Sequence, residues 1–192
     1  MVRVDVDEVV PRVGAPQERP RVHAYDEDAR PFLRRTDKRY DLIYVDAYQQ
    51  PYVPFYLATK EFFELVRSRL RPGGLVALNV ATVPGDRRLV EELSGTLASV
   101  FPEVRIWPAL EFNNIVIGLT APSDRVRRAP DERLDELAAL MRSQLSQPVR
   151  PSSKPWTDDH APVEWVTDQM IIEYAVEGGD FDEAPLPTAP GS

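Results

Sequence analysis

The feature that most constrains the fold is the largely apolar run Tyr40–Val45, which ends at Asp46. Its length and composition predict a β-strand buried in an α/β sheet. Ligands of open α/β sheets bind beyond the carboxyl ends of the strands, so Asp46 is a candidate for work on a small molecule. The alternative is that Asp46 only caps the next turn, because aspartate often accepts hydrogen bonds from the backbone two residues on.

Strand and helix signals alternate along the rest of the chain. Short strands are predicted at residues 2–6 and 21–25, an apolar strand at 75–80, and a closing pair at 104–107 and 114–119. Helices are predicted to begin near Asp28, Thr59 and Asp86, which are residue types suited to N-caps. The alternation predicts an α/β fold, a mostly parallel sheet with helices on both faces and an antiparallel edge pair.

We expect three parts in the chain. Residues 1–122 form the α/β domain, and residues 123–176 form a C-terminal helical extension packed on it. In that extension, a helix is predicted from Asp131 to Leu145, followed by a linker and an ordered apolar segment at 162–174. Residues 177–192 are expected to be a disordered, acidic and proline-rich tail.

Composition excludes several classes of site. The chain has no cysteine, so disulfides and thiolate metal sites are excluded, and its 2 histidines lack a metal-binding spacing. We therefore expect no metal. No apolar run approaches the roughly 18 residues of a membrane span, and no signal peptide opens the sequence. A cytoplasmic protein without a membrane span is expected.

Charge is unevenly spread over the chain, whose net charge is −8. No Lys or Arg follows Lys154, whereas acidic residues continue to Glu183, so the part before it is close to neutral. This balance argues against nucleic acid as a partner, because phosphates require clustered cations. The acidic end either attracts a cationic partner or only keeps the chain solvated.

Three carboxylates each stand at or just after a predicted strand end: Asp5, Asp28 and Asp46. In a right-handed βαβ series these ends line one edge of the sheet, so the three are expected to face one crevice. The first acid can accept hydrogen bonds from ribose hydroxyls, and the second can accept one from the amine of a purine. The third can take a proton or hold a cation. Each also has a plain structural alternative as a cap or a surface charge.

Several segments of this chain resemble the spermidine synthase family, the polyamine aminopropyltransferases, and above all its bacterial spermidine synthase-like members. The resemblance covers roughly residues 2–120, and residues 157–165 resemble a segment near the C-terminus of that bacterial group. The matching segments are Asp5-Val6-Asp7, Glu27-Asp28-Ala29, the run from Tyr40 to Tyr48, and the stretch from Phe62 to Pro72-Gly73-Gly74.

The resemblance implies a class I methyltransferase-like Rossmann fold that binds decarboxylated S-adenosylmethionine as a co-substrate, with no tightly bound cofactor. Asp5 then takes the position of the ribose-binding acid, and Asp28, with Ala29, that of the adenine-binding site. Asp46 becomes the catalytic proton acceptor for a diamine such as putrescine, with Tyr48 and Gln49 beside it in the amine site.

The sequence departs from the family pattern in two places. Gln49 stands where the family has a second acid. Its amide carries no negative charge, so the site loses an electrostatic attraction of about 1–4 kcal/mol for a diamine. The family's first strand and glycine-rich loop, expected before Asp5, are absent. Three explanations stay open: a fragment or mis-set start, a degenerate relative, or a partner chain that supplies the strand, with a homodimer as one arrangement.

Three functions are therefore compared. The first is aminopropyl transfer with Asp46 as general base. The second is a non-catalytic relative that binds a nucleoside or an amine, or an assembly module. The third is an S-adenosylmethionine-dependent methyltransferase. The acid-rich site and the Tyr48–Pro51 loop argue against it, because they favour an amine substrate.

Overall fold

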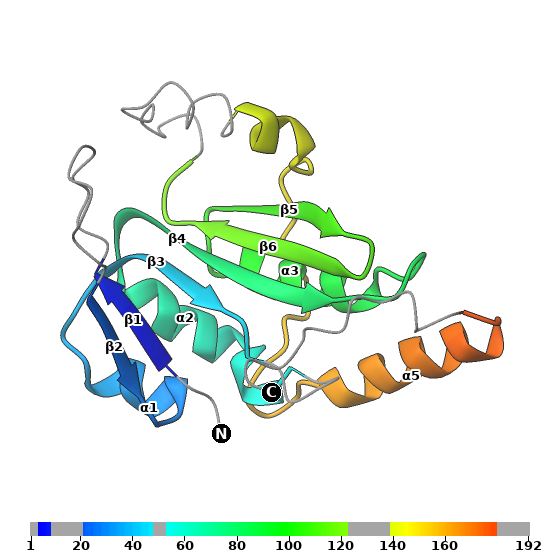
Figure 1. The fold of residues 1–192 in the computed structure, drawn as a ribbon, viewed down its shortest axis with the longest axis horizontal. Coiled ribbons are helices and arrows are strands. Elements are labelled where there is room, and N and C mark those ends of the chain that lie inside the picture. Colours follow the sequence, from blue (N-terminus) through cyan, green and yellow to red (C-terminus); the bar gives the residue numbers. More distant parts are fainter. Residues whose placement is uncertain (1–3, 9–20, 48–52, 123–138, 180–192) are drawn as a thin grey trace. The chain divides into compact units, whose positions relative to one another are not determined.

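A computed structural model of the chain describes residues 4–8, 21–47, 53–122 and 139–179. The chain divides into two compact units, Met1–Lys38 and Arg39–Ser192 (Figure 1). The first unit contains β1, β2 and α1, and the second contains the remaining described helices and strands.

In the first unit, β1 (Val4–Glu8) and β2 (Arg21–Tyr25) pair in antiparallel fashion. Both strands were predicted, but the expected parallel orientation is wrong. Parallel strands need a long crossover, usually a helix, and the connecting sequence between them contains three prolines, which disfavour a helix there.

Helix α1 (Ala29–Arg35) begins where the sequence predicts it. The carboxylate of Asp28 accepts a hydrogen bond from the backbone N–H of Arg30 at 2.8 Å, which makes Asp28 the N-cap. Phe32 and Leu33 are the buried residues of this helix, and the Phe32 ring lies 5.0 Å from that of Tyr25, centroid to centroid.

The second unit is built on a four-stranded sheet in the order β3-β4-β6-β5 (Figure 1). β3 (Tyr40–Val45) runs parallel to β4 (Leu70–Ala81). β6 (Asn113–Leu119) pairs antiparallel with both β4 and β5 (Glu103–Leu110). The predicted α/β class and the antiparallel closing pair are confirmed.

Helices α2 (Lys60–Ser68) and α3 (Arg88–Ala98) lie on one face of this sheet, behind it in Figure 1. The side chains of β4 that point to this face, Val76, Leu78 and Val80, are at most 3% exposed. On the other face Leu42 and Tyr44 of β3 are 54% and 52% exposed. Within the described residues, helices therefore cover one face rather than both, and β3 is half-exposed instead of buried.

The Pro72-Gly73-Gly74 segment lies inside β4, although proline and glycine are typical of the residues just after a helix. Helix α2 stops at Ser68, and Leu70 already pairs with Tyr40. The pairing register then shifts before Leu42, and Gly73 has a φ of 82°, which a side chain disfavours. The proline and glycines thus form an irregular stretch within the strand.

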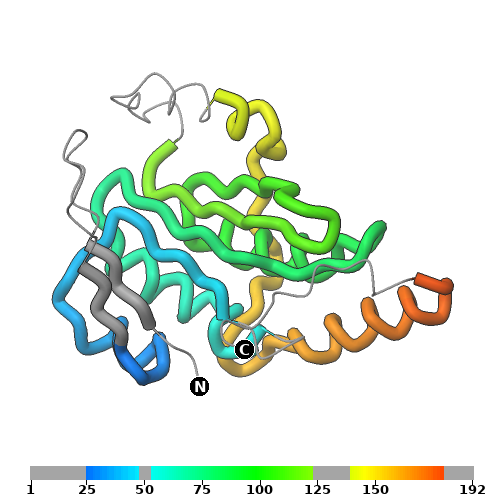
Figure 2. The backbone as a smooth tube through the Cα atoms, in the orientation of Figure 1, coloured from blue at the N-terminus to red at the C-terminus, as the bar shows by residue number. Residues whose placement is uncertain are grey.

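Residues 146–160 cross from the sheet edge to the helical layer, in yellow and orange in Figure 2. The backbone N–H of Val149 donates to the carbonyl of Val104 in β5 at 2.9 Å, and that of Ser152 donates to Gly95 in α3 at 3.0 Å. The buried Trp156 accepts a hydrogen bond from the backbone of Lys60 at 2.8 Å. The segment therefore ties β5, α3 and α2 together.

Helix α5 (Val163–Val176) occupies the segment that was predicted only as ordered and apolar. Its buried residues are Val163, Val166, Thr167 and Met170, and it packs against α3. No helix among the described residues is both long enough and apolar enough to span a lipid bilayer. Of the helix predicted after Asp131, residues 139–144 are described and helical, and the rest lies outside the described residues.

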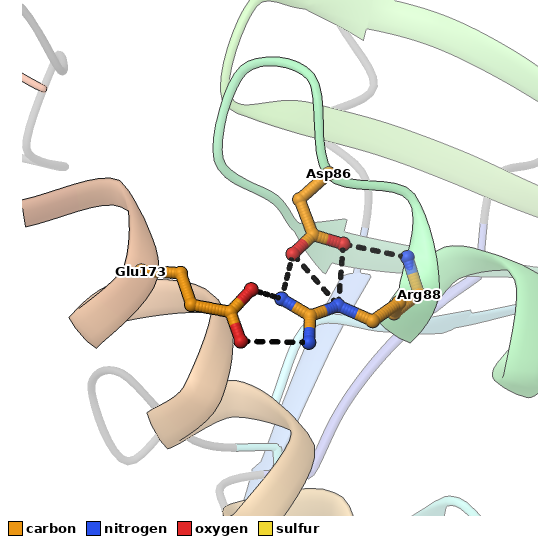
Figure 3. A network of polar contacts seen from close by, with 3 residues as sticks. All are labelled: Asp86, Arg88 and Glu173. Carbon is orange, nitrogen blue, oxygen red and sulfur yellow. Dashed lines mark hydrogen bonds and ion pairs between the residues drawn. The ribbon is translucent and has the colours of Figure 1, made fainter. Parts of the chain in front are cut away.

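An ion-pair network joins α5 to the start of α3 (Figure 3). The guanidinium of Arg88 contacts the carboxylates of both Asp86 and Glu173, at 2.6 Å for Nη2 to Oε2 of Glu173. Hydrogen bonds from Arg88 hold the pKa of Asp86 below its usual value of 3.8, and the two carboxylates raise the pKa of Arg88. The network supplements the apolar contact between these helices.

Candidate active site

Asp46 lies one residue beyond the carboxyl end of β3, as the sequence predicts. Because β3 and β4 are parallel and Val45 is opposite Leu78, Asp46 comes beside Asn79 of β4. The side-chain amide of Asn79 donates a hydrogen bond to Oδ1 of Asp46 at 3.0 Å. Within the described residues Oδ2 accepts no hydrogen bond, so this exposed carboxylate has one oriented oxygen and one available oxygen.

Tyr44 shares the open face of the sheet with Asp46, because side chains two residues apart on a strand point the same way. Burial raises the pKa of the Tyr44 hydroxyl above its usual value of 10.0, and the negative charge of Asp46 raises it further. The tyrosine therefore remains protonated near neutral pH, and it presents an aromatic ring and a hydroxyl next to the carboxylate.

The loop that follows Asp46 is described only in part. Tyr48 and Gln49, the predicted amine-site residues, lie outside the described residues. The described part resumes at Val53 and contains the short 3-10 helix η1 (Phe55–Leu57). There the rings of Phe55 and Tyr56 meet edge to face at 5.7 Å, and Phe55 is 43% exposed.

The predicted nucleoside-binding residues belong to the first unit. Asp5 was predicted near a strand end, but this is wrong, because β1 runs on to Glu8 and Asp5 is its second residue. Asp5 is opposite Ala24 in the β1–β2 pair, so its backbone lies next to the last residues of β2. Asp28 and Ala29 follow the same end of β2, where Asp28 serves as the N-cap of α1. The antiparallel pairing thus brings the backbones of Asp5 and Asp28 to one end of the hairpin. Asp46 belongs to the second unit.

A hollow of about 460 Å³ opens beyond the carboxyl end of β4. The loop between β4 and α3 lines it with Thr82 and Asp86, and the β5–β6 hairpin lines it with Glu111 and Asn114. The buried amide of Asn114 donates to the hydroxyl of Thr82 at 3.1 Å. The hollow therefore carries polar groups at the same end of the sheet as Asp46, although Asp46 does not line it.

Sequence reasoning missed Asn79 and Tyr44 as neighbours of Asp46. Asn79 has a signal in the sequence, since it is the polar residue near the carboxyl end of the apolar run Leu75–Val80. Tyr44 has a weaker signal, its position two residues before the candidate acid in a predicted strand. Both signals depend on knowing that β3 and β4 are adjacent and parallel.

A profile of the spermine/spermidine synthase domain matches residues 6–117, which is more than half of the 192 residues. The chain belongs to this family. The matched region contains Asp28 and Asp46 as well as Asn79, and its start lies one residue after Asp5. The family resemblance seen in the sequence is therefore confirmed.

Three bacterial relatives match parts of the chain. The chain is 43% identical over 75 residues to a probable polyamine aminopropyl transferase of Bifidobacterium longum, covering 38% of this chain and 17% of the relative. It is 36% identical over 95 residues to polyamine aminopropyltransferase 2 of Pseudomonas aeruginosa, covering 47% of this chain and 27% of the relative. A polyamine aminopropyltransferase of Vibrio vulnificus is 30% identical over 109 residues, covering 52% and 35%. The matches thus span about a third or less of these relatives.

A solved structure of a probable spermidine synthase from Corynebacterium glutamicum has a similar fold. The TM-score is 0.50 at 20% identity, and the match covers 69% of this chain and 54% of that one. At this identity the likeness concerns the fold, and it agrees with the methyltransferase-like α/β architecture that the sequence predicts.

Proposed function

We propose that this chain takes part in aminopropyl transfer, from decarboxylated S-adenosylmethionine to a primary amine, with Asp46 as the proton acceptor. The observation that carries the proposal is the Asp46 carboxylate at the carboxyl end of β3, with one oxygen held by Asn79. Family membership supports the reaction class. The chain matches only about a third or less of the length of these relatives, so we also propose, rather than infer from them, that the chain is active by itself.

The chemistry explains why a carboxylate is needed. An alkylamine has a pKa near 10, so at neutral pH its nitrogen carries a proton and cannot attack. In the proposed step the ammonium gives one proton to Oδ2 of Asp46, and the nitrogen lone pair so freed bonds to the aminopropyl carbon. The bond from that carbon to sulfur breaks at the same time, and the sulfonium becomes a neutral thioether.

The surroundings of Asp46 suit this role. The hydrogen bond from Asn79 orients the carboxylate, and a positioned general base typically contributes about 10²- to 10⁴-fold to the rate. The half-exposed ring of Tyr44 offers an aromatic surface that attracts an ammonium group. Tyr48 and Gln49 complete the proposed amine site for a diamine such as putrescine. The amide of Gln49 attracts such a diamine less than the family's acid would.

Asp5, Asp28 and Ala29 are the proposed nucleoside-binding residues. Their backbones share one end of the β1–β2 hairpin, which is consistent with a common ligand. The proposal further places the protein in the cytoplasm. It also includes a homodimer or a partner chain that adds a strand beside β3, one of the two terminal strands of the four-stranded sheet.

The first test is ligand binding. Calorimetry with decarboxylated S-adenosylmethionine or methylthioadenosine should detect binding to the chain, and Asp28→Asn should weaken it. No binding at millimolar ligand would show that this chain alone is not the enzyme and would favour a non-catalytic or assembly role. Binding of S-adenosylmethionine with methyl transfer, and no aminopropyl transfer, would favour the methyltransferase instead.

The second test compares two identical substitutions in one strand region. Asp46→Asn should lower turnover about 10²- to 10⁴-fold, because the amide cannot accept the proton. Asp41→Asn is the matched control, since Asp41 is an exposed residue of β3 that pairs with Arg71. Equal losses in the two variants, or full turnover in Asp46→Asn, would contradict the assignment of the base.

A further inference from the structure

One face of α5 carries an apolar stripe that points to solvent. Trp165, Ile172 and Val176 are 62%, 60% and 82% exposed. Their spacing of i, i+7 and i+11 places them on one side of an α-helix, and their Cα atoms span about 16 Å. Ile172 and Val176 are neighbours one turn apart, and Trp165 lies on the same side two turns earlier. Exposed apolar side chains gathered on one side of a helix mark interaction sites more often than isolated apolar residues do.

The stripe is not needed to hold α5 in place. The opposite side of the helix carries the buried residues Val163, Val166 and Met170, and α5 packs against α3. The ring of Tyr174 also meets that of Phe112 edge to face at 6.2 Å, and Glu173 pairs with Arg88 (Figure 3). The helix is therefore anchored by its inner side, which leaves the outer stripe available for a partner.

The charge around the stripe selects among partners. The helix bears the exposed acids Glu164 and Asp168, and also Glu173, which is already paired with Arg88. It has no lysine or arginine, and Glu177 follows directly after it. A second copy would bring the same acids against them, and an anionic lipid surface would repel them. The sequence after α5 adds further acids and no base, so it has the same charge as the helix.

We propose that the outer face of α5 docks a cationic amphipathic segment of another protein, whose apolar side chains cover Trp165, Ile172 and Val176 while its lysines and arginines meet the acids. An amphipathic helix laid against apolar anchors is a common mode of peptide recognition. Complementary charge sets the register and speeds association. This inference does not depend on the proposed transferase activity.

The test uses a synthetic amphipathic helix built from leucine and lysine as the probe, labelled for fluorescence anisotropy, and its leucine–glutamate counterpart. The chain should bind the lysine peptide and not the glutamate peptide. The double variant Ile172→Ser, Val176→Ser should weaken binding about tenfold, as expected for loss of about 1.4 kcal/mol at central apolar anchors. Leu140→Ser is the matched control, since Leu140 is 57% exposed outside α5 and should bind as the parent does.

Two further variants keep the test decisive. Trp165→Ala should weaken binding in the same direction, and far-UV circular dichroism should show that each variant keeps its helix content, because the changed residues are exposed. Glu164→Gln with Glu177→Gln should weaken binding at low salt and have a smaller effect at high salt, since salt screens exposed charges.

Four outcomes would overturn the proposal. The first is unchanged binding of the lysine peptide to the Ile172→Ser, Val176→Ser variant, and the second is equal binding of the two peptides. The third is self-association of the chain, seen by analytical ultracentrifugation and abolished by the same substitutions, which would mean that a second copy covers the stripe. The fourth is binding to phosphatidylcholine vesicles that the substitutions abolish, which assigns it to a lipid surface.

Discussion

The two faces of β4 differ in burial although their residues alternate along one strand. Val76, Leu78 and Val80 point to the face that α2 and α3 cover and are at most 3% exposed. Asn79, between two of them, points to the open face and contacts Asp46. The covered face provides the apolar burial that stabilises the unit, and the open face is free to carry polar groups that can reach a ligand.

The largest expected effect compares one substitution on the two faces. Leu78→Ala removes a side chain that is 3% exposed and should lower the free energy of unfolding by about 2–5 kcal/mol. Leu42→Ala, on the open face at 54% exposure, should cost about 0.5 kcal/mol. Urea denaturation of both variants measures the difference. Similar losses would mean that the open face is covered in solution.

A smaller effect is expected from the N-cap of α2, one of the helices on the covered face. The hydroxyl of the fully buried Thr59 accepts from the backbone N–H of Phe62 at 3.3 Å and donates to Oδ1 of Asp158 at 2.6 Å. Thr59→Ala should lower the free energy of unfolding by about 1–2 kcal/mol, because the helix loses its N-cap.

Asp158→Ala is the control for that experiment, since it removes the contact from residues 146–160 and leaves the cap intact. It should cost less than Thr59→Ala in the same urea measurement. A loss as large as that of Thr59→Ala would show that the tie to the C-terminal segment, rather than the cap, stabilises α2.

The third prediction concerns the network of Asp86, Arg88 and Glu173 at the end of the helical layer. The pKa of Asp86 is lower in the folded chain than its ordinary value of 3.8, so its charged form stabilises the folded state above that pH. Asp86→Asn should be less stable than the parent by about 1 kcal/mol at neutral pH. The difference should shrink as the pH falls below 3.8, when the parent carboxylate becomes protonated.

Thermal or urea unfolding over this pH range measures the effect. Glu91→Gln is a suitable control, because Glu91 forms an exposed i, i+4 pair with Arg87 and should change stability by only about 0.3–0.5 kcal/mol. A stability gap between the parent and Asp86→Asn that stays constant with pH would contradict the lowered pKa.

The smallest effect is confined to the open face. Asp46→Asn should lower the pKa of Tyr44, because the charge of Asp46 is one of the two causes that raise it. The pKa should nevertheless stay above 10.0, since burial is the larger cause. An alkaline absorbance titration, compared with Tyr44→Phe to isolate this residue, measures the shift. Asp41→Asn should leave the pKa of Tyr44 unchanged. An unchanged pKa in Asp46→Asn would mean that the charge of Asp46 does not act on Tyr44.

Local patterns in the sequence predict the elements of the covered side well. The helical spacing of Leu89, Leu93 and Leu97 predicts α3, and these residues are at most 2% exposed. Asp28 and Thr59 were predicted as N-caps and accept backbone hydrogen bonds in that role. Such features depend on interactions within a few residues, which is why a single sequence is enough to find them.

Helix α5 shows the opposite case. Its apolar residues lie on both the inner and the outer side, so no single apolar face marks it as an amphipathic helix. The sequence therefore predicts an ordered apolar segment without its type. The burial of Val163 and Met170 and the packing of α5 on α3 decide that the segment is helical and which residues stay exposed.

The α/β class, the family and the place of Asp46 at a strand end could all be predicted from the amino-acid order, because strand length, helical periodicity and short motifs are local properties. The antiparallel pairing of β1 and β2, the packing of α2 and α3 on one face of the four-stranded sheet, and the contact between Asn79 and Asp46 came only with the folded structure. Those features depend on pairing between segments far apart in the chain. Many pairings satisfy the same local pattern, and the free energy of the whole packed unit selects among them.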